Sequence, residues 1–319
     1  KSNLYSPDLL TNNNVYCLAD DNDSNLWIGT QGGLNVLNKK TGEIRKYLSP
    51  TIPNNTVSCL LITQNSSVWI GTDTGLCRYI PEQDSFVTYT IETTGGILGS
   101  YAIKSLFEDS TGDIWIGTWC NGLYRYASAT KTFVAYPQIN ERNSAHAIYE
   151  DSQKNIWVGS WECGLFLLQN PKDMKRVSYI RYQHKIGDEH SLSDNIIYDI
   201  AEDLNTHTLW VGTRTGLSIM QHEQPGHFIN YKSRKSAYHI PCDEINSIIR
   251  DDFGNMWIGS IGGGVLMTDT HESPFMLHKL NLSDEEIPST SVRALFADAN
   301  KNIWMGIGTY GLACQNHAT

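Results

Sequence analysis

The sequence contains no long apolar run, because none approaches the roughly 18 residues of a membrane-spanning helix. Positive charge is also scarce: 24 Lys and Arg stand against 34 Asp and Glu, which gives a formal net charge of −10. General nucleic-acid binding needs a basic face, so this balance argues against it. No charged-then-apolar leader follows Lys1, so we expect a signal peptide to be absent or already removed.

Common catalytic and metal-binding motifs are missing as well. There is no GxSxG elbow, no HExxH motif and no phosphate loop, and the ten histidines are scattered without ligand spacing. Residues 306–311 spell GxGxxG, but they align with an ordinary repeat and no helix is predicted after them, as a dinucleotide site would require. We therefore expect no cofactor and no metal. An enzyme whose catalytic groups converge from separate repeats stays open.

The seven cysteines are odd in number and form no CxxC pair. Cys17 and Cys59 occupy the same position in neighbouring repeats, and free buried thiols are the favoured interpretation. Cys120 and Cys163 lie in corresponding loops of neighbouring repeats, where a disulfide remains an open alternative.

Seven of the nine tryptophans mark one repeated unit. Each stands in Trp-Ile-Gly or a close variant, and successive copies are 42, 46, 42, 53, 47 and 47 residues apart. The seven are Trp27, Trp69, Trp115, Trp157, Trp210, Trp257 and Trp304. A self-similar period of this length is typical of propellers and solenoids.

Each unit reads as four short β-strands. In the first, the apolar stretch 15–18 is followed by an acidic turn at 21–25, then 26–30, a Gly-Leu start at 33–34 and a last stretch at 44–47. Residues of strand type fill the stretches, turn residues separate them, and no long segment has a convincing helical period. Four strands in about 40–50 residues is the period of a propeller blade. The sequence thus predicts an all-β fold.

The ends of the chain predict how the ring closes. The last unit has three strand-like runs and stops at Thr319, before a fourth. The segment 4–7 precedes Asn14–Leu18 much as 47–50 precedes Thr56–Leu60. We expect residues near 2–6 to supply the outer strand of blade seven, which would protect its open edge. Residues 1–319 are predicted to form a single closed seven-bladed propeller.

The repeated pattern Asp-x-x-Gly-Asn-x-Trp-Ile-Gly-Thr-x-x-x-Gly-Leu, well represented at 109–123 and 251–260, resembles the two-component regulator propeller repeat. The resemblance covers essentially the whole chain. It implies a periplasmic sensor region of a hybrid two-component system of Bacteroides-type bacteria, anchored in the inner membrane as part of a receptor. Many such receptors detect oligosaccharides released from complex glycans.

Members of this family usually carry two propellers, an immunoglobulin-like domain, a membrane helix and a histidine kinase. The sequence holds one propeller's worth, so we expect a fragment of a larger receptor or a stand-alone relative. The repeated tryptophan and turn aspartate are predicted to be structural, the one packing between blades and the other accepting backbone N–H groups. Thr63 replaces the turn aspartate in the second unit, and Ile307 replaces the usual Thr or Ser in the seventh.

Aligning the units predicts a ligand site. One position in each innermost strand is polar or amphipathic while its neighbours are mostly apolar. In chain order this series is Tyr16, Ser58, Lys104, His146, Tyr198, Asn246 and Arg293. These side chains are expected to ring one mouth of the central channel. A second series begins the following loops on the same side: Gln31, Asp73, Trp119, Trp161, Arg214, Ile261 and Gly308.

Trp119 and Trp161 are the two tryptophans left after the seven structural ones. Exposed aromatic rings beside polar groups suit a sugar, although both rings could instead pack under a neighbouring loop. The predicted mouth is more basic than the whole chain, because Arg142 joins Lys104, His146, Arg214 and Arg293 there. Since Arg pairs with carboxylate or sulfate, an anionic or uronic-acid-containing oligosaccharide is the ligand hypothesis.

The longest spacing contains a polar loop at 183–193, which is either functional or simply solvated. The leading functional prediction is a non-catalytic ligand-sensing propeller that signals to a histidine kinase, with a neighbouring propeller or immunoglobulin-like domain as partner. The alternatives are a protein-interaction scaffold without a small ligand and, less favoured, a propeller lyase or hydrolase. The aligned ring offers only His146 among common catalytic bases.

Overall fold

The computed structural model describes residues 9–21, 24–99, 101–136, 139, 144–233, 240, 242–268, 291–308 and 311–315, and the backbone alone at 276–278, 281–282 and 285–286. The chain divides into two compact units. The first comprises Lys1–Ala145 with Asp298–Thr319, and the second comprises His146–Ala297.

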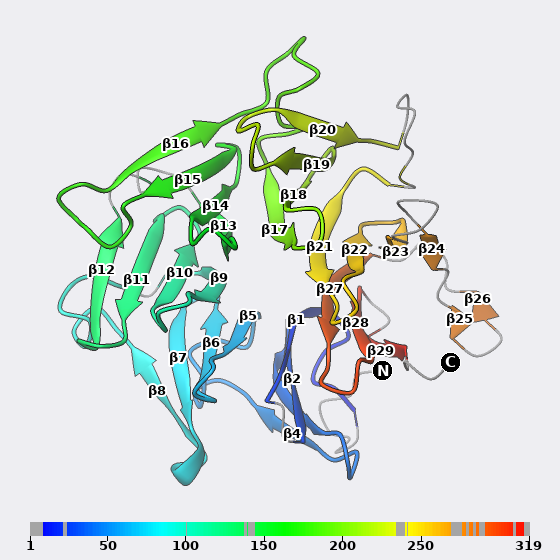
Figure 1. Ribbon diagram of the computed structural model, residues 1–319. Helices are drawn as coiled ribbons and strands as arrows, with labels where there is room; N and C mark the ends of the chain where they lie inside the picture. Colours follow the sequence, from blue (N-terminus) through cyan, green and yellow to red (C-terminus); the bar gives the residue numbers. More distant parts are fainter. Residues whose placement is uncertain are drawn as a thin grey trace. The chain divides into compact units, whose positions relative to one another are not determined.

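The first unit contains three four-stranded antiparallel sheets, each with its strands in chain order (Figure 1). Blade one consists of β1 (Val15–Asp20), β2 (Asn25–Thr30), β3 (Gly33–Asn38) and β4 (Ile44–Tyr47). Blade two consists of β5 (Val57–Ile62), β6 (Val68–Thr72), β7 (Gly75–Ile80) and β8 (Ser85–Tyr89), with the 3₁₀ turn η1 (Pro81–Gln83) before β8. Blade three consists of β9 (Ile103–Glu108), β10 (Ile114–Thr118), β11 (Leu123–Ala127) and β12 (Thr132–Tyr136). The hairpin of β28 (Ile303–Ile307) and β29 (Gly311–Gln315) also belongs to this unit.

The second unit repeats the same arrangement three times. Blade four consists of β13 (Ala145–Glu150), β14 (Ile156–Ser160), β15 (Leu165–Gln169) and β16 (Ser178–Tyr182), its first residue being the last of the first unit. Blade five consists of β17 (Ile197–Asp203), β18 (Thr208–Thr213), β19 (Gly216–Gln221) and β20 (Phe228–Tyr231). Blade six consists of β21 (Ile245–Arg250), β22 (Met256–Ser260), β23 (Gly264–Met267) and β24 (Met276–His278). The short pair β25 (Asn281–Leu282) and β26 (Glu285–Glu286) and the strand β27 (Val292–Ala297) follow.

The predicted all-β propeller of seven repeats is confirmed, and no α-helix occurs in the described residues. Likewise, no helix in the described part of the chain is long and apolar enough to cross a bilayer. The seventh repeat contributes β27 to one unit and β28 and β29 to the other. The predicted closing strand at residues 2–6 lies outside the described residues, and both closure and the single-domain organisation stay predictions.

The glycine of Trp-Ile-Gly is required by how tightly consecutive blades pack. A Cβ atom on Gly117 would lie 2.3 Å from the carbonyl oxygen of Ala145, at the start of the next inner strand. On Gly29 it would lie 2.3 Å from the Cys17 sulfur and 2.8 Å from Val57. Real side-chain contacts are never this short, so the repeat keeps glycine where the next blade approaches its backbone.

Four of the repeated tryptophans pack against residues of the next blade, as predicted: Trp27, Trp69, Trp157 and Trp210. Trp27 is 2% exposed and joins a cluster with residues of blade two, where its ring lies 5.0 Å from that of Tyr79. The turn aspartates accept backbone N–H groups, as predicted, and they also accept the indole N–H of the tryptophan six residues later. These indole bonds measure 3.5 Å for Trp27–Asp21, 2.9 Å for Trp115–Asp109, 2.7 Å for Trp157–Asp151, 2.9 Å for Trp257–Asp251 and 2.8 Å for Trp304–Asp298.

All seven cysteines lie in the described part of the chain and carry free thiols. The free-thiol prediction for Cys17 and Cys59 is therefore confirmed, and burial raises the pKa of Cys59 to about 12. The disulfide left open between Cys120 and Cys163 is not formed. Gly311, the last residue of the GxGxxG stretch, begins strand β29 and not a helix.

Candidate ligand-binding site

The predicted ring position is the second residue of every inner strand. The residue before it is fully buried in all seven repeats: Val15, Val57, Ile103, Ala145, Ile197, Ile245 and Val292. In β1, β5, β9, β17 and β21 the pairing register with the next strand shifts at this point, which marks a β-bulge. A bulge leaves one residue outside the ladder and re-aims its side chain, so the fold singles out the same residue that the alignment did.

The second predicted series lies beside the start of the inner strands. The backbone N–H groups of Gln31, Asp73, Trp119, Arg214 and Ile261 donate to carbonyl oxygens just before the inner strand of their own blade, at 2.8–3.2 Å. These five residues therefore lie at the end of the blade where the ring position lies. In each of these blades the two series meet, as the sequence predicted.

In the first unit, Lys104 lies between Asp73 and Trp119. Its Nζ atom is 3.0 Å from Asp73 Oδ1 and 6.0 Å from the centre of the Trp119 ring. Trp119 is 37% exposed, so its ring is accessible from solvent. Lys104 and Trp119 belong to blade three and Asp73 to blade two, so neighbouring blades build this group together.

The other first-unit members of the ring differ in role. Tyr16 is half-buried in β1. The Ser58 hydroxyl donates to the Gly71 carbonyl at 3.2 Å and also bonds the Ile103 carbonyl of blade three, so it joins two inner strands. We assign Ser58 a structural part, because its hydroxyl is committed to the backbone.

In the second unit, three rings follow one another across blades four and five. His146 lies 5.1 Å from Trp161, and Trp161 lies 5.9 Å from Tyr198 in an edge-on arrangement. The Tyr198 hydroxyl donates to Glu244 Oε1 of blade six at 2.7 Å. Burial and this hydrogen bond raise the pKa of Tyr198, so the phenol is protonated at neutral pH. Trp161 is half-buried between its two neighbours, more enclosed than Trp119.

Three of the remaining predicted residues are described by the structure. Arg214 is exposed, and its Nε atom lies 3.1 Å from Asp194 Oδ2. Arg293 is exposed on β27, and Asn246 is half-buried on β21. Arg142 lies outside the described residues, and its place in the site stays a prediction.

Carboxylates accompany two of the cations that the sequence placed at the mouth. Asp73 pairs with Lys104 and Asp194 with Arg214, which reduces the local excess of positive charge. Asp194 and Glu244 were missed by the sequence reasoning, although a signal existed. Asp194, like Asn12 and Asn54, stands three residues before its inner strand and accepts the N–H two residues later.

A further carboxylate lies one residue past Tyr198. Asp199 accepts N–H groups from Ile200 at 2.9 Å and from Ile248 of blade six at 2.7 Å. Burial nevertheless raises the pKa of Asp199 to about 7. In the described residues, no three His, Cys, Asp or Glu side chains are grouped so that they could hold a metal ion.

The long loop at 183–193 is held against the edge of blade five. The N–H of Phe228 donates to the His190 carbonyl at 2.8 Å, and the Asn230 amide donates to the carbonyls of Glu189 and Ser191. The loop carbonyls thus accept hydrogen bonds from the outer strand β20, which favours a structural role for the loop.

Five stretches of the sequence match a known family of propeller repeats. The family model described as "Two component regulator propeller" matches residues 9–32, 51–74, 97–120, 141–162 and 239–262. Each of the five matches includes an inner strand and the loop position of the second series. Among curated proteins, none matches this sequence.

Several solved structures share the fold. The extracellular domain of the hybrid two component system BT3049 of B. thetaiotaomicron is 22% identical, with a TM-score of 0.77 over 96% of this chain and 40% of that one. PorZ of Porphyromonas gingivalis is 15% identical, with a TM-score of 0.73 over 96% of this chain and 46% of that one. Virginiamycin B lyase of Staphylococcus aureus is 14% identical, with a TM-score of 0.70 over 94% of both chains.

The chain spans about 40% of the length of BT3049's extracellular domain. At these identities the structural likeness establishes the fold. The repeat itself is identified independently, by five matches of the family model that recur with the blade period. The predicted resemblance to the two-component regulator propeller repeat is thus confirmed for these five stretches.

Proposed function

We propose that this chain is a non-catalytic ligand-sensing propeller of a periplasmic two-component sensor, and that it recognises an oligosaccharide derived from a glycan. The observation that carries the proposal is the group formed by Trp119, Lys104 and Asp73, where an accessible ring lies beside an ion pair. The repeat family and the extracellular sensor domain of similar fold support the sensor class and the compartment.

The chemistry of these groups suits a sugar. The indole face of Trp119 can cover the apolar C–H face of a pyranose ring, while Lys104 and Asp73 donate to and accept from its hydroxyls. A paired Lys and Asp serve neutral hydroxyl groups well, because one supplies donors and the other acceptors. His146, Trp161 and Tyr198 offer a second combination of ring faces and polar atoms in the other unit.

Whether the site prefers an anionic or a neutral sugar depends on the cations that face the ligand. An anionic sugar would draw on Arg293 and Arg214, the latter at the expense of its bond to Asp194. A neutral sugar would leave both ion pairs in place. We propose to test both classes, because the aspartate partners reduce the charge on which the anionic hypothesis depended.

Signalling is proposed to work through the position of this chain relative to a neighbouring propeller or immunoglobulin-like domain of the same receptor. Each blade is a hydrogen-bonded sheet with a packed core, so a rigid-body shift costs less than deformation within a blade. A ligand moves such an equilibrium only by binding the two arrangements with different affinity. A histidine kinase is the proposed receiver of that shift.

The test is a thermal-shift and calorimetric screen against defined neutral and anionic oligosaccharides. A ligand at a hundred times its Kd stabilises the folded state by about 2.7 kcal/mol, which such a screen detects. Binding at the first-unit group should be lost in Trp119→Ala, and binding at the second-unit rings should be lost in Trp161→Ala. Phe253→Ala is the matched control, because it removes another exposed ring, in the turn at the opposite end of its inner strand.

The outcomes separate the alternatives. A hit that survives Trp119→Ala would refute the site, and a response to anionic sugars alone that disappears in Arg293→Ala would support the anionic class. No response to any sugar would favour the protein-interaction scaffold. Binding followed by sugar cleavage would favour a lyase or hydrolase, for which Tyr198 and Glu244, 2.7 Å apart beside His146 and Trp161, are the candidate groups.

A further inference from the structure

The last strand of blade four, β16, has an open edge. It pairs with β15 and is the terminal strand of its sheet (Figure 1). In the described part of the chain, no backbone hydrogen bond from outside the sheet reaches β16, whereas β20 of blade five donates to the loop 183–193. Alternate residues of an edge strand direct their N–H and C=O groups away from the sheet, so β16 can accept one further strand.

The side chains of β16 are more exposed than those of the other outer strands. The four consecutive residues 178–181 are exposed, and no other outer strand whose side chains are described has such a run. Tyr179 is 41% exposed, whereas Phe133 and Phe228, at the corresponding positions of blades three and five, are 6% and 1% exposed. Ile180 is 40% exposed. An aromatic and an aliphatic side chain therefore face solvent beside the open backbone edge.

Strand alternation places Tyr179 and Arg181 on one face of β16 and Ile180 on the other. On the first face, both side chains pack against the buried Phe166. The Tyr179 ring centre lies 5.3 Å from that of Phe166, and the Arg181 guanidinium carbon lies 5.4 Å from it. Arg181 Nε also donates to the Cys163 carbonyl at 2.7 Å. In the described residues no carboxylate pairs with Arg181, so its terminal nitrogens can form a bidentate contact with one.

The turn that leads into β16 carries more positive charge. This turn, 170–177, is longer than the corresponding turns of blades one, two, three and five, at 39–43, 81–84, 128–131 and 222–227. It contains Lys172, Lys175 and Arg176 and one carboxylate, Asp173, in a chain whose net charge is −10. Asp173 Oδ1 accepts the N–H of Lys175 at 3.0 Å, and Oδ2 lies 3.7 Å from Arg176 Nε. The Arg176 side chain is 80% exposed, so this pairing is weak and leaves the cation accessible.

The charge of this edge determines which strand it can accept. Lysine and arginine at an open edge keep like edges apart, so pairing between the β16 strands of two copies is disfavoured. A strand that carries carboxylates meets opposite charge instead, from Arg181 on the strand and from the turn before it. Blade two provides the contrast within the same chain, because the turn before β8 contains Glu82 and Asp84. An acidic strand should therefore prefer β16 to β8.

We propose that β16 is a docking edge for an extended acidic segment of a partner protein, which adds to blade four as a further strand. Main-chain hydrogen bonds supply the affinity of such an addition, and the alternating side chains supply its specificity. Carboxylates at every second position of the segment face Arg181 and the turn cations, while the apolar residues between them cover Ile180. This surface is independent of the proposed sugar site, which involves the first strands of the blades and not the last.

The experiment titrates the full chain with fluorescently labelled peptides and follows anisotropy. The probe is acetyl-EVEVEVEV-amide, in which glutamate and valine alternate with the period of a strand. Its block isomer, acetyl-EEEEVVVV-amide, has the same charge without the alternation, and acetyl-KVKVKVKV-amide has the opposite charge. We expect a Kd of about 100 µM or tighter for the alternating acidic peptide. The block isomer should bind about tenfold more weakly, and the basic peptide should not bind.

Two variants test whether the peptide binds at β16. The double variant Lys175→Glu/Arg176→Glu changes only exposed side chains of the turn and should weaken binding about tenfold or more. Ile180→Glu should weaken it similarly, because it places a like charge on the apolar face of the edge. The matched control is Val87→Glu, at the corresponding position of blade two and 44% exposed, which should bind like the wild type. Circular dichroism and melting temperature confirm the fold of each variant.

Three results would overturn the proposal. The first is no binding of the alternating acidic peptide by the wild type at about 1 mM, roughly ten times the expected Kd. The second is equal binding of the block isomer, or binding retained in the double variant, because either would show that the peptide does not add to this edge. The third is a dimer in analytical ultracentrifugation that Ile180→Glu converts to a monomer, which would mean that a second copy of this chain occupies the edge.

Discussion

Blade two has a tryptophan whose indole N–H has no acceptor among the described residues, and supplying one should stabilise the protein. Trp69 is 2% exposed, and its Nε1 atom is buried without a hydrogen-bond partner. In blade three the equivalent Trp115 donates to Asp109 at 2.9 Å. Thr63 stands at the aspartate position of blade two, and its hydroxyl binds Asn65 and Ser67 instead. The perturbation is Thr63→Asp.

The expected gain is about 1–2 kcal/mol. A buried donor left without a partner costs roughly 1–3 kcal/mol, and a hydrogen bond to a charged acceptor contributes about 1.5–3 kcal/mol. Part of this is offset by desolvation of the new carboxylate and by Glu108, which accepts the N–H of Gln64 at 2.7 Å and brings a like charge near the turn.

The gain should depend on pH. In blade seven, burial raises the pKa of Asp298, but the hydrogen bonds from Trp304 and Asn302 outweigh it and hold the pKa below 3.8. A carboxyl whose pKa is lowered in the folded state contributes stability above its unfolded pKa, and this contribution is lost as the pH falls through the folded pKa. The added stability of Thr63→Asp should therefore be full at pH 7 and absent near pH 2.

The assay is urea unfolding at pH 7 and at acid pH. Thr63→Asn is the neutral control, because it offers an acceptor of similar shape without a titrating group. The reciprocal variant Asp109→Thr recreates the blade-two turn in blade three and should cost about 2 kcal/mol. The reasoning is refuted if Thr63→Asp is no more stable than the wild type at pH 7, or if its gain persists at acid pH.

Three further predictions concern contacts between blades. Gly117→Ala should cost at least about 3 kcal/mol in urea unfolding, because its Cβ would meet the carbonyl of Ala145. In Gly42→Ala nothing lies within 4 Å of the new Cβ, so this variant should lose less stability even though its φ is 77°, and an equal loss would contradict the clash. Burial raises the pKa of Asp199 to about 7, so between pH 4 and 7 the folded protein holds a proton that the unfolded chain releases. The stability of the wild type should therefore fall as the pH rises through this window, relative to that of Asp199→Asn. Melting temperatures of the two proteins that change in parallel from pH 4 to 8 would contradict this. Glu202→Ala should cost about 3 kcal/mol by the same unfolding assay, since buried Glu202 accepts the N–H and hydroxyl of Ser152 and lies 3.0 Å from His222; a loss under 1 kcal/mol would contradict it.

The sequence predicts which positions form the candidate site, but not which residues their side chains contact. The alignment identifies the second residue of each inner strand because it is polar or amphipathic while its neighbours are mostly apolar. The structure adds a buried residue before it in every repeat and a β-bulge in five of them. The partners of Lys104, Arg214 and Tyr198 were not identified as such. Asp73 belongs to the preceding blade and Glu244 to the following one, so only the packing of blades brings these atoms together.

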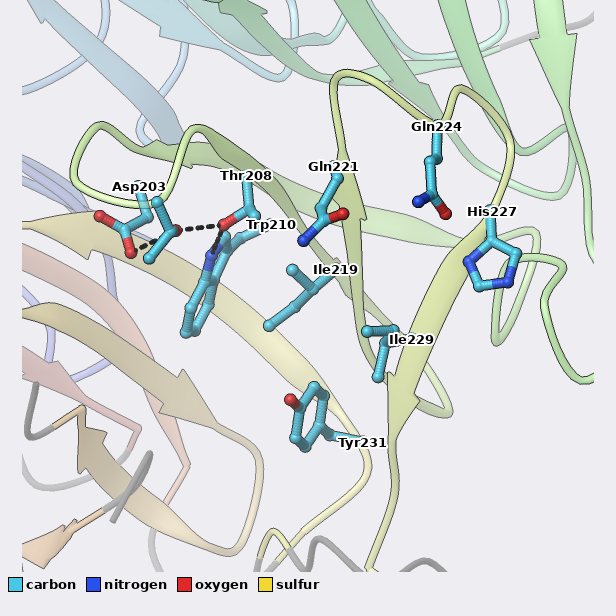
Figure 2. A pocket seen from close by; sticks show the side chains of 10 residues that line it. Asp203, Thr208, Trp210, Ile219, Gln221, Gln224, His227, Ile229 and Tyr231 are labelled. Atoms are coloured by element: carbon cyan, nitrogen blue, oxygen red, sulfur yellow. Dashed lines mark hydrogen bonds between the residues drawn. The ribbon is translucent and has the colours of Figure 1, made fainter. Parts of the chain in front are cut away.

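The sequence by itself determined the all-β class, the seven repeats and the strand pattern of each blade. These features follow from local rules, because each unit of about 45 residues repeats the same turn residues, the same apolar alternation and the same glycine after Trp-Ile. Only the tertiary structure shows that the indole N–H of Trp69 lacks an acceptor among the described residues. It also shows that the indole N–H of Trp210 donates to Thr208 instead of to the turn aspartate. It also placed a pocket of about 310 Å³ in blade five, with Trp210 in its wall (Figure 2). The physical reason is that a hydrogen bond or a cavity depends on distances of a few tenths of an ångström between chain segments, which the residue pattern of a single repeat does not contain.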